Sequence, residues 1–377
     1  MRILQVHNRY RSSQVSGENV VVELLSASLT ARGHDVCRFE PSSDELSGLS
    51  SVRAIPAPFG VGAWSRKLRQ VLASWRPDVA LVHNVYPLLG PQCVSDIAQH
   101  GIPVAHVVHN YRHSCISGNH WRNGAGCELC GSASRKSGVI HGCYRGSRAQ
   151  SAILTCAETY GARSWGRLRL VINISAWMQQ EVMSTSALRG IDSVVISNPV
   201  APPASPSPGV RDFLFVGRLA DEKGIRLLLQ AWAMAQTDWT LHIAGDGPLA
   251  GQVIQAARTL PRIDYHGAVS PDKIAELRHR TAVACVPALW DEPFGLVIAE
   301  AYASGQAVLA TRHGAFPEIV REGFGELLDD DPASWAKALS AHSDQKNDAS
   351  AAIAHWDRNF SPRHIAEAYE TTLQNLL

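Results

Sequence analysis

The chain has 377 residues, of which 45% are hydrophobic and 18% are charged. This length suits two domains rather than one core, and this composition excludes an intrinsically disordered chain. No apolar run approaches the roughly 20 residues that span a bilayer. The sequence opens on a strand-like run, MRILQVHN, that lacks the features of a signal peptide. We therefore expect a cytoplasmic protein with two domains.

Short runs rich in β-branched residues alternate with helical patterns in the first half of the chain. Such runs are typical of parallel strands that are buried on both faces of a sheet. Between the first two runs, residues 17–34 have helical spacing and a stop signal at Gly33. The strand-like runs cover residues 3–7, 36–39, 79–82, 104–108, 170–174 and 194–196.

A Pro- and Ser-rich segment, APPASPSPG at 201–209, predicts a domain boundary because so many prolines disfavour both helix and strand. A second alternation follows this segment. Its expected strands are FLFVG, TLHIAG, IDYHG, VACVP and AVLAT, and its expected helices cover 223–235, 249–260, 274–279 and 296–303. The last stretch has amphipathic helical spacing that starts at Ser361 and Pro362.

Two tandem βα arrays predict an α/β protein with two Rossmann-like, doubly wound domains that face each other across a cleft. We assign residues 1–198 to an N-terminal, acceptor-side domain and 199–360 to a C-terminal domain. Residues 361–377 are expected to form a helix that crosses back onto the N-terminal domain.

The strongest chemical signal is E-P-F-G-L-V-I-A-E, from Glu292 to Glu300. Pro293 suits a helix start, so Glu292 is expected at the helix mouth and Glu300 about two turns inside. Two carboxylates at this spacing can accept hydrogen bonds from two parts of one polyhydroxylated ligand. The backbone N–H groups of residues 294–296 would also be free to bind an anion or a hydroxyl. The alternative is two solvent-facing glutamates on an amphipathic helix.

A second signal, F-V-G-R-L-A-D-E-K-G, follows the first expected strand of the C-terminal half. Arg218 and Lys223 would flank the strand-to-helix turn, where doubly wound folds bind ligands. Two cations there, with Gly217 and Gly224 allowing close approach, indicate a diphosphate site. The alternative is a surface Arg and Lys on an ordinary turn. The sequence contains neither a P-loop nor a G-x-G-x-x-G motif.

Together these motifs resemble the family-four retaining glycosyltransferases of the GT-B fold, in a branch that acts on bacterial polysaccharides. The resemblance covers nearly the whole chain. It rests on S-G-E-N (16–19), V-V-H-N-Y (107–111), V-G-R…K-G, A-G-D-G-P (244–248), H-G-A-V (266–269), E-P-F-G…E and T-R-H-G-A-F-P-E (311–318). It implies transfer of a sugar from a nucleoside-diphosphate sugar to a hydroxyl acceptor.

The resemblance also implies roles for single residues. Glu300 would hold the ribose hydroxyls of the nucleotide. Arg218 and Lys223 would bind the donor diphosphate and steady the leaving group. Glu292, with the amides of residues 294–296, would contact hydroxyls of the transferred sugar. The other donor-side positions are Gly17, Gly217, Gly245, Val269, Phe294, Gly295 and Leu296.

On the acceptor side, the resemblance places His109 beside the sugar and the reacting bond. The neighbouring acceptor-side positions are Glu18, Asn19, Asn110 and Tyr111. The reaction of this family keeps the anomeric configuration, and the departing phosphate is described as helping to deprotonate the acceptor. Because Arg218, Lys223 and helix N-termini supply positive charge, we expect catalysis to need no metal or other cofactor.

This sequence departs from the family pattern in two loops. Ser16 and Gly17 stand where relatives often have two glycines, and Ala315 follows Gly314 where a second glycine is common. The contacts of these two loops are therefore left open.

A Cys-rich insert at 111–146 follows His109. Its four thiols could form a structural zinc site that holds together a loop poor in apolar residues. A redox-active pair or simply reduced, packed cysteines are the alternatives. The four cysteines are Cys115, Cys127, Cys130 and Cys143.

The charge is unevenly distributed. Residues 1–198 contain 20 basic and 12 acidic side chains, whereas the remainder contains 15 and 22. A basic first half indicates an anionic, glycan or lipid-linked acceptor, or contact with the inner face of a membrane; the alternative is two solvated faces of opposite sign. The basic helical segment 64–75 would either rest on a membrane or cover a sheet. We expect no nucleic-acid partner.

Two other functions fit the same motifs. One is a sugar-nucleotide epimerase or hydrolase with the same fold. The other is a non-catalytic protein that binds nucleotide sugars, or an adaptor whose loop is held together by zinc. Identity of the donor base, sugar and acceptor does not follow from motif spacing.

Overall fold

The computed structural model describes the chain except for residues 14–15, 47–54, 132–133, 203–210 and 343–347. Most of the expected Pro-rich boundary therefore lies outside the described residues. The chain divides into two compact units. The first consists of Met1–His120, Glu128–Pro199 and Pro362–Leu377, and the second of Trp121–Cys127 and Val200–Ser361. Within the described residues, no helix is long and apolar enough to cross a membrane.

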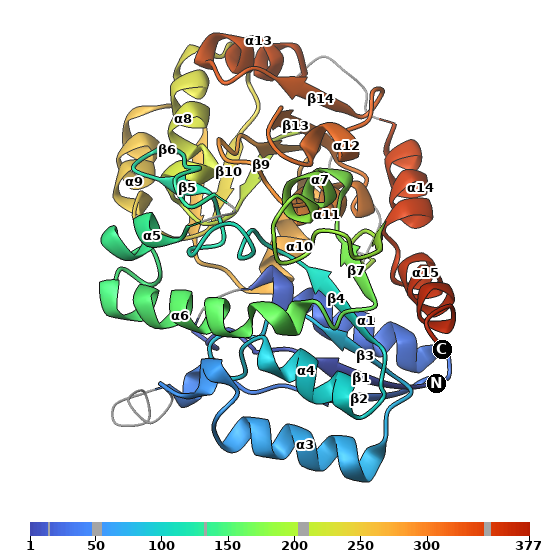
Figure 1. Ribbon diagram of the computed structural model, residues 1–377. Coiled ribbons are helices and arrows are strands. Elements are labelled where there is room, and N and C mark those ends of the chain that lie inside the picture. Colours follow the sequence, from blue (N-terminus) through green and yellow to red (C-terminus); the bar gives the residue numbers. More distant parts are fainter. Residues whose placement is uncertain (14–15, 47–54, 132–133, 203–210, 343–347) are drawn as a thin grey trace. The chain divides into compact units, whose positions relative to one another are not determined.

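The first unit contains a parallel six-stranded sheet in the order β2-β1-β3-β4-β7-β8 (Figure 1). Strands β3, β4 and β7 are buried along their whole length, as their unbroken β-branched runs predict. The strands are β1 (Arg2–Val6), β2 (Asp35–Phe39), β3 (Val79–Val82), β4 (Val104–Val108), β7 (Leu170–Asn173) and β8 (Ser193–Val195).

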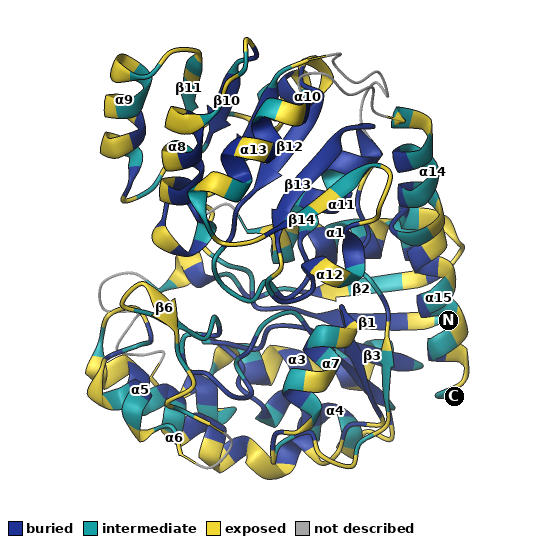
Figure 2. Cartoon of the chain, turned by 90° about the horizontal axis from the view of Figure 1, so that it is seen from above, coloured by how far each residue is buried: buried dark blue, intermediate teal, exposed yellow. Residues whose placement is uncertain are grey.

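Helices with one buried face cover this sheet, and Figure 2 shows their buried and exposed stripes. The main helices are α1 (Gly17–Ala31), α3 (Ala63–Trp75), α4 (Gln92–Gln99), α5 (Lys136–Ile140), α6 (Arg148–Trp165), α7 (Ala176–Met183) and α15 (Pro362–Gln374). The basic helix α3 buries Leu68 and Leu72, and Arg69 donates to Asp96 of α4 at 2.9 Å. Helix α3 therefore packs against the unit on one side, as an ordinary covering helix does.

Helix α15 is the last element of the first unit and packs against α1. Ile365, Tyr369 and Leu373 are buried, as the amphipathic spacing predicts. At its edge, Glu370 accepts a hydrogen bond of 2.6 Å from the Arg32 guanidinium, immediately after α1.

The second unit contains another parallel six-stranded sheet, in the order β11-β10-β9-β12-β13-β14. Its strands are β9 (Phe213–Val216), β10 (Leu241–Ala244), β11 (Ile263–Gly267), β12 (Val283–Val286), β13 (Ala307–Thr311) and β14 (Gly325–Leu328). The main helices are α8 (Ile225–Met234), α9 (Ala250–Thr259), α10 (Pro271–Arg280), α11 (Leu296–Ala303), α12 (Phe316–Ile319), α13 (Pro332–His342) and α14 (Ala349–Asn359). Two parallel doubly wound sheets confirm the predicted α/β fold class.

One helix begins later than the sequence suggests. We expected a helix from Lys223, but Asp221–Lys223 forms a single 3-10 turn and α8 begins at Ile225. The cause is Gly224, which has φ +70° and interrupts the helix. A Cβ atom at this position would lie 1.6 Å from the carbonyl oxygen of Pro287, so only glycine fits here.

Candidate active site

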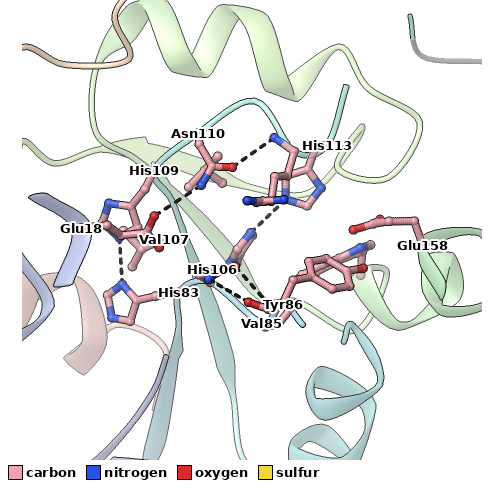
Figure 3. Close-up of a pocket in the computed structure, with 14 residues that line it drawn as sticks. Glu18, His83, Val85, Tyr86, His106, Val107, His109, Asn110, His113 and Glu158 are labelled. Carbon is pink, nitrogen blue, oxygen red and sulfur yellow. Dashed lines mark hydrogen bonds between the residues drawn. The ribbon is translucent and has the colours of Figure 1, made fainter. Parts of the chain in front are cut away.

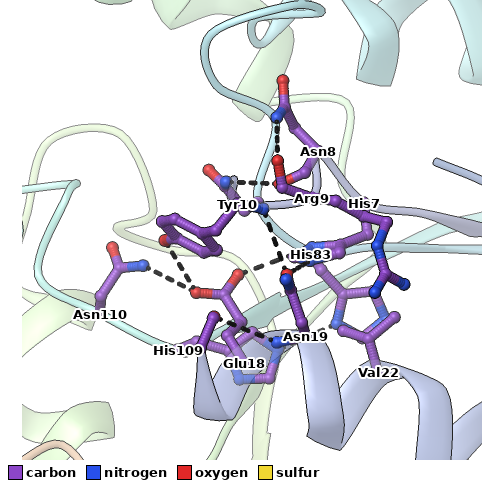
Figure 4. Close-up of polar contacts among 12 residues, drawn as sticks. His7, Asn8, Arg9, Tyr10, Glu18, Asn19, Val22, His83, His109 and Asn110 are labelled. Carbon is purple, nitrogen blue, oxygen red and sulfur yellow. Dashed lines mark hydrogen bonds and ion pairs between the residues drawn. The ribbon is translucent and has the colours of Figure 1, made fainter. Parts of the chain in front are cut away.

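Three histidines meet at the carboxyl ends of neighbouring strands of the first unit. Strands β1, β3 and β4 lie side by side, and each runs into the same three residues, V-H-N. His83 Nδ1 lies 2.9 Å from His109 Nε2, and their rings stack with centroids 5.2 Å apart. The His7 ring stands edge-on to His83 at 6.1 Å (Figure 4). Sequence analysis selected only His109; the repeated V-H-N after three strand-like runs is the signal that could have identified the other two.

The hydrogen-bond partners of His83 determine which ring nitrogen of His109 carries its proton. The amide nitrogen of Gln5 donates to the carbonyl of Val22 at 3.3 Å and lies 3.2 Å from His83 Nε2. Because an amide nitrogen only donates, His83 Nε2 accepts, and His83 Nδ1 carries the proton that it donates to His109. His109 then carries its own proton on Nδ1. Burial lowers the pKa of both His83 and His109, which favours these neutral forms.

Glu18, in the first turn of α1, connects this cluster to the loops around it. Its carboxylate accepts hydrogen bonds from the Tyr10 hydroxyl at 3.1 Å and from Asn110 at 3.4 Å. Asn19 accepts from His7 Nε2 at 2.8 Å. Three of the expected acceptor-side residues, Glu18, Asn19 and Asn110, therefore surround the histidines.

The other two expected residues of this region lie differently. Gly17 is exposed at the first position of α1. Tyr111 is fully buried, stacks on the His120 ring with centroids 4.5 Å apart, and accepts a hydrogen bond from Trp177 at 2.8 Å. These contacts hold the segment after β4 in place, and the acceptor-side role of Tyr111 stays a prediction.

A small cavity of about 30 Å³ lies beside His109 and is lined by residues of α1, β4 and α6 and of the segments that follow β3 and β4 (Figure 3). This volume has room for one or two water molecules. His106 Nδ1 donates to the carbonyl of Val82 at 2.8 Å, so its Nε2 accepts from His113 at 2.9 Å. The lining includes His83, His106, His109, Arg112, His113 and Glu158.

In the second unit, both chemical motifs lie where the strand order reverses. Strands β9 and β12 are sequence-distant neighbours, and ligands of doubly wound sheets bind outside the carboxyl ends of such strands. Lys223, from the turn after β9, forms an ion pair with Glu292, from the loop after β12. Lys223 also lies 5.1 Å from the centre of the Trp290 ring. Arg218, whose side chain is 61% exposed, pairs with Glu222.

The loop after β13 fixes the backbone of Glu292. Gly314 has φ +56°, and a Cβ atom there would lie 2.4 Å from the backbone nitrogen and oxygen of Glu292. The amide of Ala315 donates to the Glu292 carbonyl at 2.9 Å. This loop therefore packs on the Glu292 backbone, and its contact with a donor stays a prediction.

His313 and Asp291 are functional-site neighbours that sequence analysis missed. His313 Nε2 lies 2.6 Å from Asp330, and its Nδ1 lies 3.5 Å from Asp291. Hydrogen bonding to Asp291, with a contribution from Asp330, raises the pKa of His313 to about 9. His313 is therefore an imidazolium at neutral pH, next to the residue that precedes Glu292.

Glu300 lies on α11 and has a buried partner. Its Oε2 accepts a hydrogen bond of 2.6 Å from Arg278 of α10. Arg278 is buried and also donates to Gln306 at 3.2 Å, whereas the Glu300 side chain is 43% exposed. Arg278 holds the exposed acid in one orientation. From the sequence alone, Arg278 would be interpreted as a solvent-exposed charge on a polar helix.

The remaining donor-side positions form the strand-end loops. The amide of Gly245 donates to the Gly267 carbonyl at 2.8 Å, and the amide of Gly217 donates to Ala244 at 3.1 Å. Val269 packs against the small cluster between the sheet and α10. At the start of α11, Phe294 is buried, Gly295 is the N-cap and Leu296 is the first helical residue.

The four cysteines do not lie in one unit. Cys115, Cys130 and Cys143 belong to the first unit and Cys127 to the second. Cys115 is buried and its sulfur lies 3.1 Å from the Ser117 hydroxyl. The zinc site remains a prediction.

The chain thus has two doubly wound parallel sheets, each with a polar cluster at its strand ends. The family model for glycosyl transferases group 1 matches residues 210–344, and the model for glycosyltransferase family 4 matches residues 15–202. The chain belongs to the family-four glycosyltransferases of the GT-B fold.

Known proteins agree with this assignment. Glycogen synthase of Mycobacterium tuberculosis is 27% identical over 366 residues, covering 86% of this chain and 81% of its own. Among solved structures, a glycosyltransferase from Rickettsia africae has a TM-score of 0.70 at 15% identity, over 100% of this chain and 98% of the other. Anabaena HepE in complex with UDP-glucose has a TM-score of 0.65 at 17% identity, over 100% of both chains.

Proposed function

We propose that this glycosyltransferase retains the anomeric configuration and transfers a sugar from a nucleoside-diphosphate sugar to a hydroxyl acceptor in bacterial polysaccharide or glycoconjugate synthesis. The observation that carries the proposal is the Lys223–Glu292 pair at the reversal of strand order. It brings together the cation expected on the diphosphate and the acid expected on the sugar. The UDP-glucose complex of HepE supports a donor of this class.

The second unit offers a charged binding partner to each part of such a donor. Glu300, held by Arg278 and partly exposed, offers carboxylate oxygens to the ribose hydroxyls. Arg218 and Lys223 bind the diphosphate and neutralise the negative charge that develops as the bond to the sugar breaks. Glu292 and the amides at the start of α11 bind hydroxyls of the sugar. Positive charge at the phosphate thus comes from side chains, and the proposal requires no metal in catalysis.

In the first unit, His109 is proposed to act as a neutral hydrogen-bond donor. Its proton lies on Nδ1, so it can donate to a sugar hydroxyl without adding a charge beside the cationic transition state. In the proposed reaction the bond from the anomeric carbon to the diphosphate oxygen breaks as the acceptor oxygen bonds to the same face. The acceptor proton passes to the departing phosphate, so the reaction needs no separate protein base.

The proposal is tested with purified protein and a panel of UDP, GDP, ADP and dTDP sugars. One donor is expected to raise the melting temperature, because a ligand that binds only the folded state stabilises it. Transfer to extracted bacterial glycan or lipid-linked saccharide is then followed by NMR of the anomeric proton. Retention is expected for the product.

Glu292→Gln is expected to abolish transfer, whereas Glu322→Gln, at an exposed glutamate of the same unit, is expected to leave it unchanged. Release of free sugar or of an epimer without any acceptor would favour the hydrolase or epimerase instead. Unchanged transfer by Glu292→Gln would exclude the proposed site, and failure of every nucleotide sugar to bind would exclude the proposed donor class.

A further inference from the structure

Three ligand-type side chains converge on the sheet of the second unit, outside the residues used above. They are His242 of β10 and Asp264 and His266 of β11. His242 Nδ1 lies 3.1 Å from His266 Nε2 and 3.4 Å from Asp264 Oδ2, and His266 Nε2 lies 3.7 Å from the same carboxylate oxygen. Among the described residues, this is the one group of three or more His, Cys, Asp or Glu side chains with ligand atoms so close together.

The strand pairing explains why these three side chains share one face. His242 pairs with Asp264 in the parallel register, and Ile243 pairs with Tyr265. The register then shifts so that Ala244 pairs with Gly267, which leaves His266 as an extra residue on β11. Since side chains alternate along a strand, His266 returns to the face of Asp264. Alternation along β11 therefore places a second imidazole beside the His242–Asp264 pair.

The spacing of the three atoms matches one bound metal ion. With metal–ligand bonds of about 2.0–2.1 Å in a tetrahedral site, ligand atoms lie about 3.3 Å apart. The three observed separations, 3.1, 3.4 and 3.7 Å, bracket this value. The Asp264 side chain is 56% exposed, which leaves a fourth position open to water.

The Asp212 carboxylate lies near Nε2 of the buried His242, the ring nitrogen that does not face the other two side chains. His242 Nε2 lies 3.7 Å from Asp212 Oδ2, and the other oxygen of Asp212 accepts from the Thr240 amide at 2.8 Å. At 3.7 Å the carboxylate makes no direct hydrogen bond to His242, but its negative charge lies on the side of the ring where a ligating histidine carries its proton. The nearby cations of α10, Lys273 and Arg280, both pair with Glu276.

We propose that His242, Asp264 and His266 bind one divalent transition-metal ion of the zinc class, with Asp212 orienting His242. Two imidazoles and one carboxylate suit such an ion better than magnesium or calcium, which prefer oxygen ligands alone. The ion would join the edge strand β11 to β10 just before the loop that contains Val269. The site is independent of the proposed donor site, so one can fail without the other.

The test measures metal bound per full-length chain. Wild-type protein, loaded with Zn²⁺ and dialysed, is expected to hold one more equivalent than His266→Gln by elemental analysis. Zn²⁺ is expected to raise the melting temperature of wild type and not of that variant. Asp212→Asn is expected to lose about 10–100-fold in affinity. His279→Gln, at an exposed histidine of α10, serves as the matched control and is expected to bind like wild type.

Co²⁺ distinguishes this site from the cysteines. Bound at His242, Asp264 and His266, it is expected to give visible absorption without a thiolate-to-metal charge-transfer band. Circular dichroism in excess chelator shows whether His266→Gln folds, and Asp264→Asn provides a second variant that removes one ligand. Equal metal content in wild type and both variants would overturn the proposal, as would an equal loss in His279→Gln.

Discussion

The two units place their polar clusters at the same point of similar sheets but use opposite chemistry. In the first unit, burial lowers the pKa of His83 and His109, and imidazoles and amides make most of the contacts, with Glu18 as the one carboxylate described among them. In the second unit, the partners are ionised: Lys223 with Glu292, Arg218 with Glu222, and a protonated His313 with Asp291 and Asp330. The difference fits a division of work in which one unit orients hydroxyl groups and the other binds the charged diphosphate.

The largest effect is expected for a substitution in the second unit, whose polar side chains form ion pairs. Lys223→Ala removes the cation proposed to meet the leaving group and leaves Glu292 without its partner. We expect kcat/KM for sugar transfer to fall about 10²–10³-fold, as for the loss of one transition-state donor. Lys337→Ala, at an exposed lysine of α13, is the control and should transfer normally. A similar small change in both variants would mean that the charged pair does not serve the reaction.

In the first unit, the residue to change is His83, which is proposed to affect the reaction by fixing the position of the proton on His109. His83→Phe keeps a ring but removes the donor to His109 Nε2, and we expect kcat to fall about 10–100-fold with little change in KM. His83→Gln restores an amide donor and should recover part of the loss. The ¹⁵N shifts of His109 should report a proton on Nδ1 in wild type and a mixture in His83→Phe. An unchanged tautomer in His83→Phe would contradict this role.

The two kinds of histidine predict opposite dependence of stability on pH. For His83 and His109 the folded-state pKa is lowered, so the unfolded chain takes up protons first below about pH 6.5 and the free energy of unfolding decreases there. For His313 the folded-state pKa is raised to about 9, so its contribution is complete below about pH 6.5 and is lost as the pH rises through about 9.

The alkaline part of this prediction can be isolated with one variant. His313→Gln should lose about 1–2 kcal/mol of stability at pH 6 relative to wild type, after screening by solvent, and much less at pH 10. Urea unfolding at both values measures the difference, with His279→Gln as the control. A loss of equal size at pH 6 and pH 10 would show that the effect is not electrostatic.

The smallest effect is expected for a charged pair of the first unit that lies away from the strand ends. Arg32→Ala removes the hydrogen bond to Glu370 and should change the free energy of unfolding only slightly, because both side chains are partly exposed and solvent screens the pair. Tyr369→Ala, which empties a buried position of the same helix, should cost about 3–5 kcal/mol. Comparable losses in the two variants, measured by urea unfolding, would refute this ranking.

Much of the fold follows from local sequence. Buried parallel strands need β-branched runs on both faces, so 79–82 and 104–108 identify β3 and β4 directly. Strand β14 and helices α4, α5, α7 and α12 to α14 were not predicted. Strand β14 is short and only partly buried, so its residues show no such run. The late start of α8 depends on the Pro287 carbonyl, which no local pattern contains.

The residues of the candidate site likewise divide into those that local sequence identifies and those that it does not. Arg218, Lys223, Glu292 and Glu300 stand in motifs, because their positions relative to a strand end or helix start are local properties. Arg278 and Asp291 act through contacts made by tertiary structure, and nothing in their own segments distinguishes them from solvated charges. The bulge at His266 depends on pairing between two strands and is likewise invisible in either strand alone.

The route of the chain has a consequence for synthesis on the ribosome. The chain leaves the first unit at Pro199 and re-enters it at Pro362, and Arg32 meets Glu370 across 338 positions. Helix α1 therefore stays uncovered on the side of α15 until residues 200–361 and then α15 itself have been translated. Such long-range closure slows folding, because a large loop must be ordered before its contact forms. The second unit, which is almost continuous in the chain, can fold earlier, and the nascent first unit is where chaperones would be expected to bind.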